Sequence, residues 1–295
     1  MKILVIGKDG QLGKSIKNRT DSIKSHDFLF VGRSDFDMGN IENINNFFNR
    51  STTFDIIVNC AAYTDVEKAE IEPDIANQIN HIAVKELAEI SNRKKIKFIH
   101  ISTDYVFNGK SDKPYIETDT AKPINVYGET KFDAELAIKS VMNNNALIIR
   151  TSWMYSEYGN NFVKTMLKLG KEKEEVKVVS DQIGSPTYAG DLADAITTII
   201  QSKKFNTETF QSEIFHYSNE GATSWFNFAK EIYRITGINC KITPISTNQF
   251  ISKVNRPKMT AMDINKISNY FKIKLSPWKE SLIKMYNLNP EIFKI

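Results

Sequence analysis

Three glycines that directly follow a short apolar run constrain the fold of this chain more than any other feature of its sequence. The run KILVIG has the composition of a buried strand, and the segment GKDGQLGKSI then leads into a helix-like pattern. Glycines at a strand-to-helix turn let the backbone turn tightly and let a pyrophosphate approach the free N–H groups of the helix N-terminus. The segment therefore predicts a dinucleotide-binding turn. The expected contacts come from Gly7, Gly10, Gln11, Leu12 and Gly13.

Further apolar runs alternate with helix-like segments along the first half of the chain. The strand-like runs are residues 28–32, 55–62, 96–103 and 146–153, and long helices are expected over 72–90 and from Tyr127 onward. Apolar runs that are buried on both faces and separated by helices indicate an α/β fold with a doubly wound parallel sheet. We expect a Rossmann domain over 1–150 and a second, smaller mixed α/β substrate lobe over 151–295, with some elements of that lobe packed back on the sheet.

Composition and charge narrow the classes of protein to which the chain can belong. A length of 295 residues with 41% hydrophobic content supports one large domain or two unequal ones. The net charge of +4 comes from Lys and Arg spread along the whole chain, which argues against nucleic acid as a partner. No signal peptide is seen and no apolar stretch approaches the ~18 residues that span a bilayer, so we expect no membrane partner. Two cysteines, Cys60 and Cys240, favour a reducing cytoplasm, and the scattered histidines lack zinc-ligand spacing.

The end of the second strand-like run indicates which dinucleotide binds. NAD-binding sites usually carry Asp or Glu there, which accepts hydrogen bonds from the ribose 2′-OH. This chain has Gly32, Arg33 and Ser34 instead, and a cation beside a hydroxyl suits a 2′-phosphate. We therefore expect NADPH as the cofactor, without strict exclusion of NADH, and place Asp37 near the adenine amino group. The alternative interpretation is a surface arginine in an ordinary loop.

A tyrosine four residues before a lysine occurs twice, and only one of the two pairs is in a suitable context. Tyr127 and Lys131 begin a helix after the fourth strand-like run, so they share one helix face near the carboxyl edge of the sheet, where α/β folds bind ligands. Tyr270 and Lys274 lie in a late segment far from the strand ends. We assign the first pair to catalysis and Tyr270 to packing.

Reduction of a ketone needs a hydride at carbon and a proton at oxygen, and the first pair can supply the proton. Free tyrosine has a pKa of about 10, so an acid that exchanges near neutral pH requires a shift of roughly 3 units, about 4 kcal/mol. The ammonium group of Lys131 favours the phenolate of Tyr127. Thr103 ends the fourth strand-like run and is placed to hydrogen-bond the carbonyl oxygen. The alternative for Thr103 is a strand-end hydroxyl satisfied by the backbone.

Seven segments in a fixed order carry a resemblance to a known family. They are GKDGQLG, NCAAYTDVEKAE, ISTDYVFNGK, NVYGETK, RTSWMYSEYGNNFVKTM, DQIGSPTY and RPKMT. With them the chain resembles the extended short-chain dehydrogenase/reductase superfamily over nearly its whole length, and within it the dTDP-4-dehydrorhamnose reductases. The resemblance implies an NADPH-dependent enzyme that reduces the C4 ketone of a dTDP-sugar, dTDP-4-dehydro-β-L-rhamnose. It also implies that Lys131 holds the nicotinamide ribose.

The resemblance also predicts further residues that contact the cofactor and the substrate. The loop at Ala61, Ala62 and Tyr63 looks like the one that lines the nicotinamide half of the cofactor. Positions that match substrate contacts of the family are Asp104, Tyr105, Trp153, Asn161 and Arg256. Related dehydratases carry two adjacent acids after the threonine, whereas Asp104 is followed here by Tyr105. The missing second carboxylate favours simple reduction over elimination of water.

Two other functions stay open at this level. One is a 4-ketoreductase that acts on another sugar nucleotide. The other is a non-catalytic NADP-binding subunit, similar to the regulatory subunit of methionine adenosyltransferase.

Some members of the reductase family are dimers held partly by Mg²⁺ on clustered glutamates. The corresponding positions here are Ser15, Gly190 and Glu291, with Asp191 one residue further on. One carboxylate does not make a site for a hard cation. We therefore expect no metal, and either a monomer or a metal-independent dimer.

Overall fold

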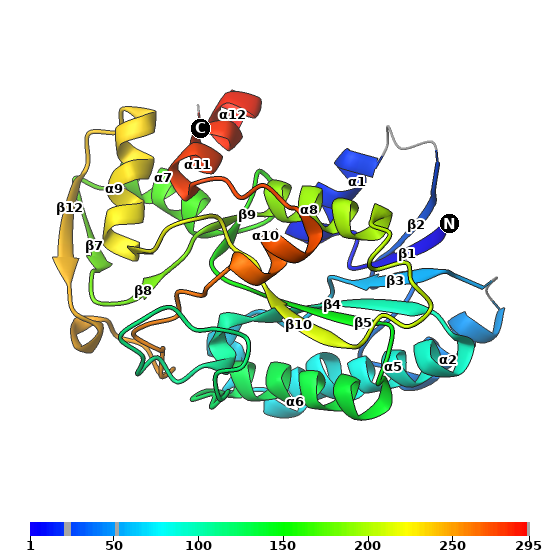
Figure 1. The fold of residues 1–295 in the computed structure, drawn as a ribbon. Helices are drawn as coiled ribbons and strands as arrows, with labels where there is room; N and C mark the ends of the chain where they lie inside the picture. The colour runs from blue at the N-terminus through cyan, green and yellow to red at the C-terminus, as the bar shows by residue number, and fades with distance from the viewer. Residues whose placement is uncertain (21–24, 51–52, 294–295) are drawn as a thin grey trace.

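Six parallel strands form one central sheet in a computed structural model that describes residues 1–20, 25–50 and 53–293 (Figure 1). The strand order is β10-β5-β4-β3-β1-β2, and every pair in it is parallel. The doubly wound parallel sheet expected from the apolar runs is confirmed. The strands are β1 (Lys2–Ile6), β2 (Asp27–Val31), β3 (Ile56–Asn59), β4 (Lys97–Thr103), β5 (Ala146–Thr151) and β10 (Glu213–His216).

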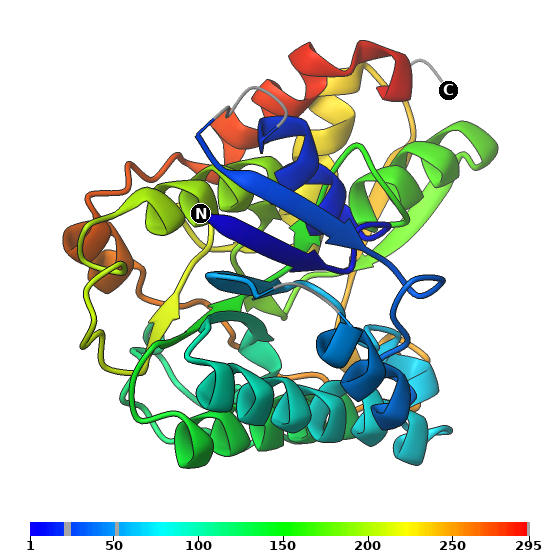
Figure 2. The same ribbon diagram turned by 90° about the vertical axis from the view of Figure 1, so that its right-hand side faces the viewer.

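Helices cover both faces of this sheet, as Figures 1 and 2 show. One layer contains α1 (Gln11–Thr20), α8 (Ala189–Gln201) and α10 (Asn265–Phe271), and the other contains α2 (Ile41–Arg50), α5 (Ala83–Lys94) and α6 (Val126–Val141). Successive strand residues point to opposite layers, so Ile3 packs under α1 and α8 whereas Leu4 packs against the second layer. Both faces are therefore buried, which explains the continuous apolar runs in the sequence.

The helix expected over 72–90 is interrupted by a wider turn. It consists of α4 (Pro73–Asn77), the π-helical turn η1 (Gln78–Ile82) and α5, and the short helix α3 (Val66–Ala69) precedes it. Asn80 lies inside the π-turn and is fully buried. Its carboxamide accepts a hydrogen bond from Tyr63 N at 2.8 Å and donates to Thr130 Oγ1 at 3.2 Å. The π-turn therefore aims a polar group inward to join the 61–64 loop to α6.

The chain after β5 builds a smaller lobe at one end of the sheet (Figure 1). Its core combines aliphatic side chains with aromatic ones that include Tyr155, Phe228 and Trp278. Its elements are β6 (Met154–Tyr155), α7 (Phe162–Glu172), β7 (Glu175–Val179), β8 (Ile183–Gly184), β9 (Thr187–Tyr188), β11 (Thr223–Ser224), α9 (Trp225–Thr236), β12 (Lys241–Ile245), α11 (Trp278–Leu288) and α12 (Pro290–Phe293). The same part of the chain also contributes α8, α10 and β10 to the sheet and its layers. None of the helices described is long and apolar enough to cross a bilayer.

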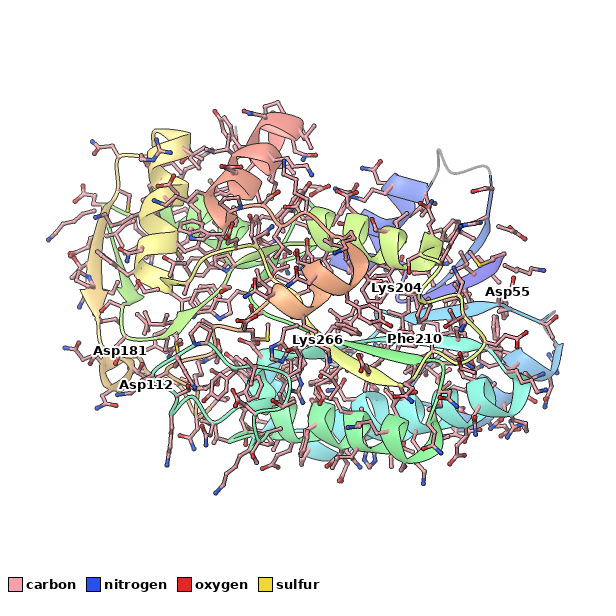
Figure 3. The ribbon with its side chains drawn as sticks, in the orientation of Figure 1. Asp55, Asp112, Asp181, Lys204, Phe210 and Lys266 are labelled. Atoms are coloured by element: carbon pink, nitrogen blue, oxygen red, sulfur yellow. The ribbon has the colours of Figure 1, made fainter. Side chains whose placement is uncertain are left out.

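Tyr270, which belongs to the second Tyr-Lys pair, lies on α10 away from the strand ends. Its ring packs against Phe215 with the centroids 5.5 Å apart. Lys204 Nζ lies 4.5 Å from the centroid of the same ring, and Phe210 meets it edge-on, at the side of the sheet formed by β10 (Figure 3). Tyr270 therefore docks α10 on the sheet.

The turn between β1 and α1 brings the helix unusually close to the strand. Gly7 adopts a φ of +96°, which residues other than glycine rarely adopt. A Cβ atom on Gly13 would lie 2.1 Å from the carbonyl oxygen of Gly7, well inside van der Waals contact. Only glycine at position 13 lets the first turn of α1 pack against this loop.

We expect Gly13→Ala to lower the free energy of unfolding by ~1–3 kcal/mol, because α1 must shift to make room for the methyl group. Gly10→Ala is the matched control, since its Cβ would lie at an ordinary 3.4 Å from Gly7 O. We expect the control to stay within ~0.5 kcal/mol of the parent. Urea unfolding of the three proteins measures the difference, and equal stability of both variants would contradict the close packing at Gly13.

Candidate active site

A cleft with a volume of about 750 Å³ opens along the carboxyl ends of β1 to β5. Its walls come from the loops that follow these strands and from residues of the smaller lobe. Of the residues predicted from the sequence, those that line it are Gly7, Gly10, Gln11, Leu12, Arg33, Asp37, Ala61, Ala62, Thr103, Asp104, Tyr105, Tyr127, Lys131 and Trp153. The structure thus brings together segments more than 140 residues apart, as the register of a parallel sheet requires.

Five predicted site residues do not line this cleft. Gly13 lies beneath the turn, and Ser34 is exposed. The Tyr63 hydroxyl donates to Glu72 Oε2 at 2.6 Å, so this side chain turns toward α4.

The other two residues outside the cleft hold elements in place. Asn161 caps α7 by accepting from Lys164 N, and its Nδ2 donates to Gln11 Oε1 at 3.0 Å. Arg256 donates to the Tyr105 hydroxyl at 3.1 Å and to a carboxylate oxygen of Glu67 at 2.9 Å. Direct contact of either side chain with a sugar nucleotide stays a prediction.

Several lining residues carry no local signal in the sequence. Phe36 and Met38 are buried apolar side chains beyond β2, and Trp225 begins α9 in the smaller lobe, far along the chain from the other lining residues. The remaining unpredicted lining residues are Ile6, Asp9, Gly32, Cys60, Thr64, Val66, Ile79, Ile101, Ser102, Thr151, Ser152, Met154, Gly159 and Asn160. Most of them directly flank a predicted residue, so the strand ends could have indicated them; nothing in the sequence around Trp225 could have.

Charged groups gather where β2 ends. Asp35 accepts a hydrogen bond from Gly32 N at 3.0 Å and forms an ion pair with Lys8. The contact with Lys8 lowers the pKa of the Asp35 carboxyl. A Cβ atom at position 32 would lie 2.2 Å from Asp9 Oδ2, so the Asp9 side chain packs directly over Gly32. Arg33 lines the cleft beside these groups and is exposed to solvent.

Thr103, Asp104 and Tyr127 form the polar centre of the cleft. Thr103 ends β4, and its hydroxyl donates to Asp104 Oδ1 at 3.1 Å and accepts from Tyr105 N at 3.2 Å. Asn125 caps α6 by accepting from Gly128 N at 2.8 Å, which places Tyr127 in the first helical turn. The rings of Tyr105 and Tyr127 meet edge-on with centroids 5.8 Å apart.

The surroundings of Tyr127 keep its phenol protonated. Burial raises the pKa of Tyr127 above its ordinary value, a hydrogen bond with Thr103 lowers it, and the charge of Asp104 raises it further. Burial also raises the pKa of Asp104 to about 7, although hydrogen bonds with Thr260 and Thr103 act against this shift. Tyr127 is therefore available as a proton donor at neutral pH.

Lys131 lines the cleft one turn after Tyr127, and its side chain turns toward β4. Its Nζ donates to Ile101 O at 2.6 Å and lies 3.1 Å from His100 Nε2. The side chain is 1% exposed, and its contacts are with β4. The lowering of the Tyr127 pKa by Lys131 is thus not seen in this geometry, because Nζ turns toward β4.

Two tryptophans form the wall contributed by the smaller lobe. Trp153 stacks on Trp225 with ring centroids 3.5 Å apart and planes 7° from parallel. Trp153 also has a positive φ of 45°, uncommon for a bulky residue. A Cβ at Gly184 would lie 2.5 Å from the Trp153 ring, so Gly184 leaves the room that the indole needs, and Trp225 covers one face of that indole. A fixed aromatic plane of this kind provides a flat surface for a ring-shaped ligand.

The cleft fits a dinucleotide at one end and a small polar substrate at the other. The close packing at Gly7 and Gly13 leaves a bare backbone cradle before α1, a helix of ten residues. Arg33 lies at the end of the neighbouring strand, and Tyr127 and Lys131 lie further along the same edge of the sheet. The residues present are therefore suited to hold NADP with its nicotinamide toward Tyr127.

Basic side chains lie beside two of the positions considered for a metal, Gly190 and Asp191. Arg19 Nη2 lies 2.2 Å from where a Cβ on Gly190 would be, and Arg19 Nε donates to Asp194 Oδ1 at 2.7 Å. The Asp191 carboxylate accepts from Lys284 Nζ at 2.8 Å and from Asn219 Nδ2 at 2.8 Å. Asp191 is therefore already neutralised by a lysine.

Comparisons with known proteins agree on one family. The profile described as RmlD substrate binding domain matches residues 1–289. A dTDP-4-dehydrorhamnose reductase of Sinorhizobium fredii is 39% identical over 285 residues, with 95% of each chain covered. A solved dTDP-4-dehydrorhamnose reductase from Clostridium acetobutylicum superposes with a TM-score of 0.91 at 38% identity, covering 98% of this chain and 100% of that one. One from Bacillus anthracis in complex with NADP gives a TM-score of 0.89 at 37% identity, covering 97% and 99%.

Proposed function

The chain belongs to the RmlD substrate-binding-domain family together with the dTDP-4-dehydrorhamnose reductases, and from this membership we propose that it reduces the C4 ketone of dTDP-4-dehydro-β-L-rhamnose with NADPH. The product is dTDP-β-L-rhamnose. We further propose that residues 1–150 chiefly bind the cofactor and that 151–295 chiefly bind the sugar nucleotide, in the cytoplasm. The free thiols of Cys60 and Cys240 are compatible with that compartment.

One observation carries the proposal. The protonated phenol of Tyr127 lies beside the Thr103 hydroxyl in the same cleft that the glycine turn and Arg33 line. An acid group at one end and a dinucleotide cradle at the other are what reduction of a carbonyl requires.

The reaction adds a hydride to the carbonyl carbon and a proton to the carbonyl oxygen. Bound NADPH supplies the hydride. Tyr127 donates its phenolic proton to the oxygen as the C=O double bond becomes a C–O single bond, and it regains a proton from solvent afterwards. The Thr103 hydroxyl, held by Tyr105 N, turns its hydrogen from Asp104 Oδ1 to the carbonyl oxygen and so orients that oxygen next to Tyr127. Asp104 lies beside the reacting centre to accept a sugar hydroxyl.

The walls of the cleft fix the substrate around this centre. The indole of Trp153, stacked on Trp225, lines the cleft from the smaller lobe and packs against the sugar nucleotide. Gln11 joins this lobe to the first turn of α1 by accepting from Ser156 and Asn161 at 3.0 Å each. Substrate and cofactor thus bind to parts of the chain that are directly hydrogen-bonded to each other.

Turnover on a panel of keto-sugar nucleotides tests the proposed function. Purified protein is mixed with NADPH and dTDP-4-dehydro-β-L-rhamnose, and oxidation of NADPH is followed by absorbance. The same assay with other 4-keto-sugar nucleotides identifies a reductase of different specificity. Binding of NADPH without reduction of any keto-sugar would favour a non-catalytic subunit and overturn the proposal.

We expect Tyr127→Phe to lower turnover by ~10²-fold or more, because the ring packing is kept while the proton donor is lost. Binding of NADPH should stay nearly unchanged, as measured by fluorescence titration. Tyr270→Phe is the matched control, because Tyr270 packs between α10 and the sheet and should leave turnover unaffected. Equal losses in both variants would contradict the role of Tyr127.

Cofactor preference depends on the end of β2. We expect kcat/KM to be higher with NADPH than with NADH, since Arg33 offers a cation where NAD-binding sites offer a carboxylate. Arg33→Asp should reverse this order through repulsion of the 2′-phosphate. Arg50→Asp, on α2, makes the same charge change outside the cleft and controls for net charge. A parent protein that already favours NADH would show that the interpretation of this strand end is wrong.

We expect activity to survive EDTA, in a monomer or in a dimer that forms without metal. The support is that Arg19 and Lys284 place cationic groups beside Gly190 and Asp191. Light scattering with and without chelator, together with turnover, measures both expectations. A dimer that dissociates only when the metal is removed would refute them.

A further inference from the structure

A chain of four hydrogen-bonded contacts runs behind the cleft and ends on Lys131. Ala61 N donates to Asn59 Oδ1 at 3.1 Å, and Asn59 Nδ2 lies 3.2 Å from His100 Nδ1. His100 Nε2 lies 3.1 Å from Lys131 Nζ, and Nζ donates to Ile101 O at 2.6 Å. The Asn59, His100 and Lys131 side chains are essentially inaccessible to solvent. The polar atoms of these side chains must therefore find their hydrogen-bond partners within the protein.

Donor and acceptor roles along this chain fix the tautomer of His100. The Ala61 N–H is a donor, so the Asn59 carbonyl oxygen faces it and the Asn59 NH₂ group faces the imidazole. The Nδ1 atom of His100 must then accept. Burial, and then the neighbouring Lys131, holds the pKa of His100 well below its ordinary value, so the ring carries a single hydrogen. That hydrogen is on Nε2, which points at Lys131.

An N–H group that points at Lys131 suits only one form of that lysine. An ammonium group has three N–H donors and no lone pair. Its N–H would face the Nε2–H of His100, and neither group could accept a hydrogen bond from the other. A neutral amine accepts from Nε2–H and still donates to Ile101 O. We propose that His100 is a positioning residue that holds Lys131 as the neutral amine against β4, and that protonation of Nζ breaks this contact and turns the ammonium group toward the cleft.

The groups around Lys131 allow both forms near neutral pH. Burial lowers the pKa of Lys131 to about 8, and the charge of Glu135 acts against this shift. Burial raises the pKa of the Cys60 thiol to about 12, so Cys60 is uncharged. Glu135, one turn further along α6, is neutralised by Arg150 of β5, whose Nη2 donates to Glu135 Oε2 at 2.6 Å. The other titratable groups beside Lys131 in the described part of the chain are His100 of β4 and Tyr127, which lies one turn earlier on α6 and lines the same cleft.

The consequence for catalysis rests on the proposed function. Loss of the proton from Tyr127 leaves a phenolate, and only the ammonium form of Lys131 stabilises that charge. Reduction should therefore decline as the pH rises through about 8, where Lys131 becomes neutral. Removal of the His100 Nε2–H group destabilises the neutral amine and raises the pKa of Lys131. The decline should then move to higher pH.

Direct titration of Lys131 in the full-length protein tests the proposal without any substrate. NMR of protein labelled with ¹³C-lysine and ¹⁵N-histidine reports the Lys131 pKa and the His100 tautomer, with Lys131→Met used only for assignment. We expect the Nε2–H tautomer and a Lys131 midpoint near pH 8 in the parent. His100→Leu should raise the midpoint by about one pH unit, since a hydrogen bond to the neutral form is lost. His100→Gln offers one acceptor and one donor group and should keep the parent midpoint.

The pH dependence of kcat should follow the same order among the three proteins. A His100 that carries its hydrogen on Nδ1, or a Lys131 that stays charged above pH 10, overturns the proposal even if His100→Leu fails to fold. The same holds for a Lys131 midpoint that is identical in the parent and the Leu variant. Titrations as expected in a protein that reduces no keto-sugar would instead refute the proposed function and leave the role of His100 intact.

Discussion

Five neighbouring parallel strands end at one edge of the sheet, and the arrangement of the cleft depends on that shared edge. The register pairs Asn59 of β3 with His100 of β4, and Thr103 of β4 with Thr151 of β5. Groups that are 41 or more residues apart along the chain therefore become direct neighbours. In open α/β sheets, ligands bind outside the carboxyl ends of the strands, where the loops that follow neighbouring strands meet. The glycine turn, the Thr103 hydroxyl and the first turn of α6 reach the same cleft for this reason.

Two basic side chains are buried beneath this edge, and the structure satisfies them in different ways. Arg150 forms a bidentate pair with Glu135, at distances of 2.6 Å and 2.9 Å. A guanidinium group does not lose its proton in proteins, so its burial requires a carboxylate. Within the described residues, the hydrogen-bond partners of Lys131 Nζ are a carbonyl oxygen and an imidazole nitrogen, and a lysine can respond to burial by becoming neutral. The fixed charge of Arg150 organises the site, while the charge of Lys131 can change with its surroundings.

The smaller lobe completes the cleft with groups that the sheet cannot provide. Its indole pair, Trp153 and Trp225, comes from a loop after β5 and from the start of α9. The hydrogen bonds of Gln11 with Ser156 and Asn161 tie this lobe to α1. A residue of the dinucleotide turn thus also fixes the position of the substrate wall. The glycine-turn segment belongs to the β1–α1 unit of the sheet, and through Gln11 it is also hydrogen-bonded to the smaller lobe.

Local sequence patterns were enough to predict the central sheet, the glycine turn and the Tyr127–Lys131 helix. Apolar runs reflect burial of a strand on both faces, and Gly13 reflects a contact within its own β–α unit. Both features depend on residues that are close together in the sequence, so a short sequence segment is enough to predict them. The π-turn at Asn80 left no such signal, because a helical pattern with one wider turn looks continuous in the sequence.

Only the tertiary structure decided which groups those predicted residues meet. It placed Lys131 against His100, stacked Trp225 on Trp153, and put Arg256 on Glu67 outside the cleft. The sequence specifies the chemistry of each side chain and its face on a strand or helix. The protonation state of a buried lysine depends instead on donors and acceptors supplied by other strands, and their positions are set only when the sheet and its layers pack together.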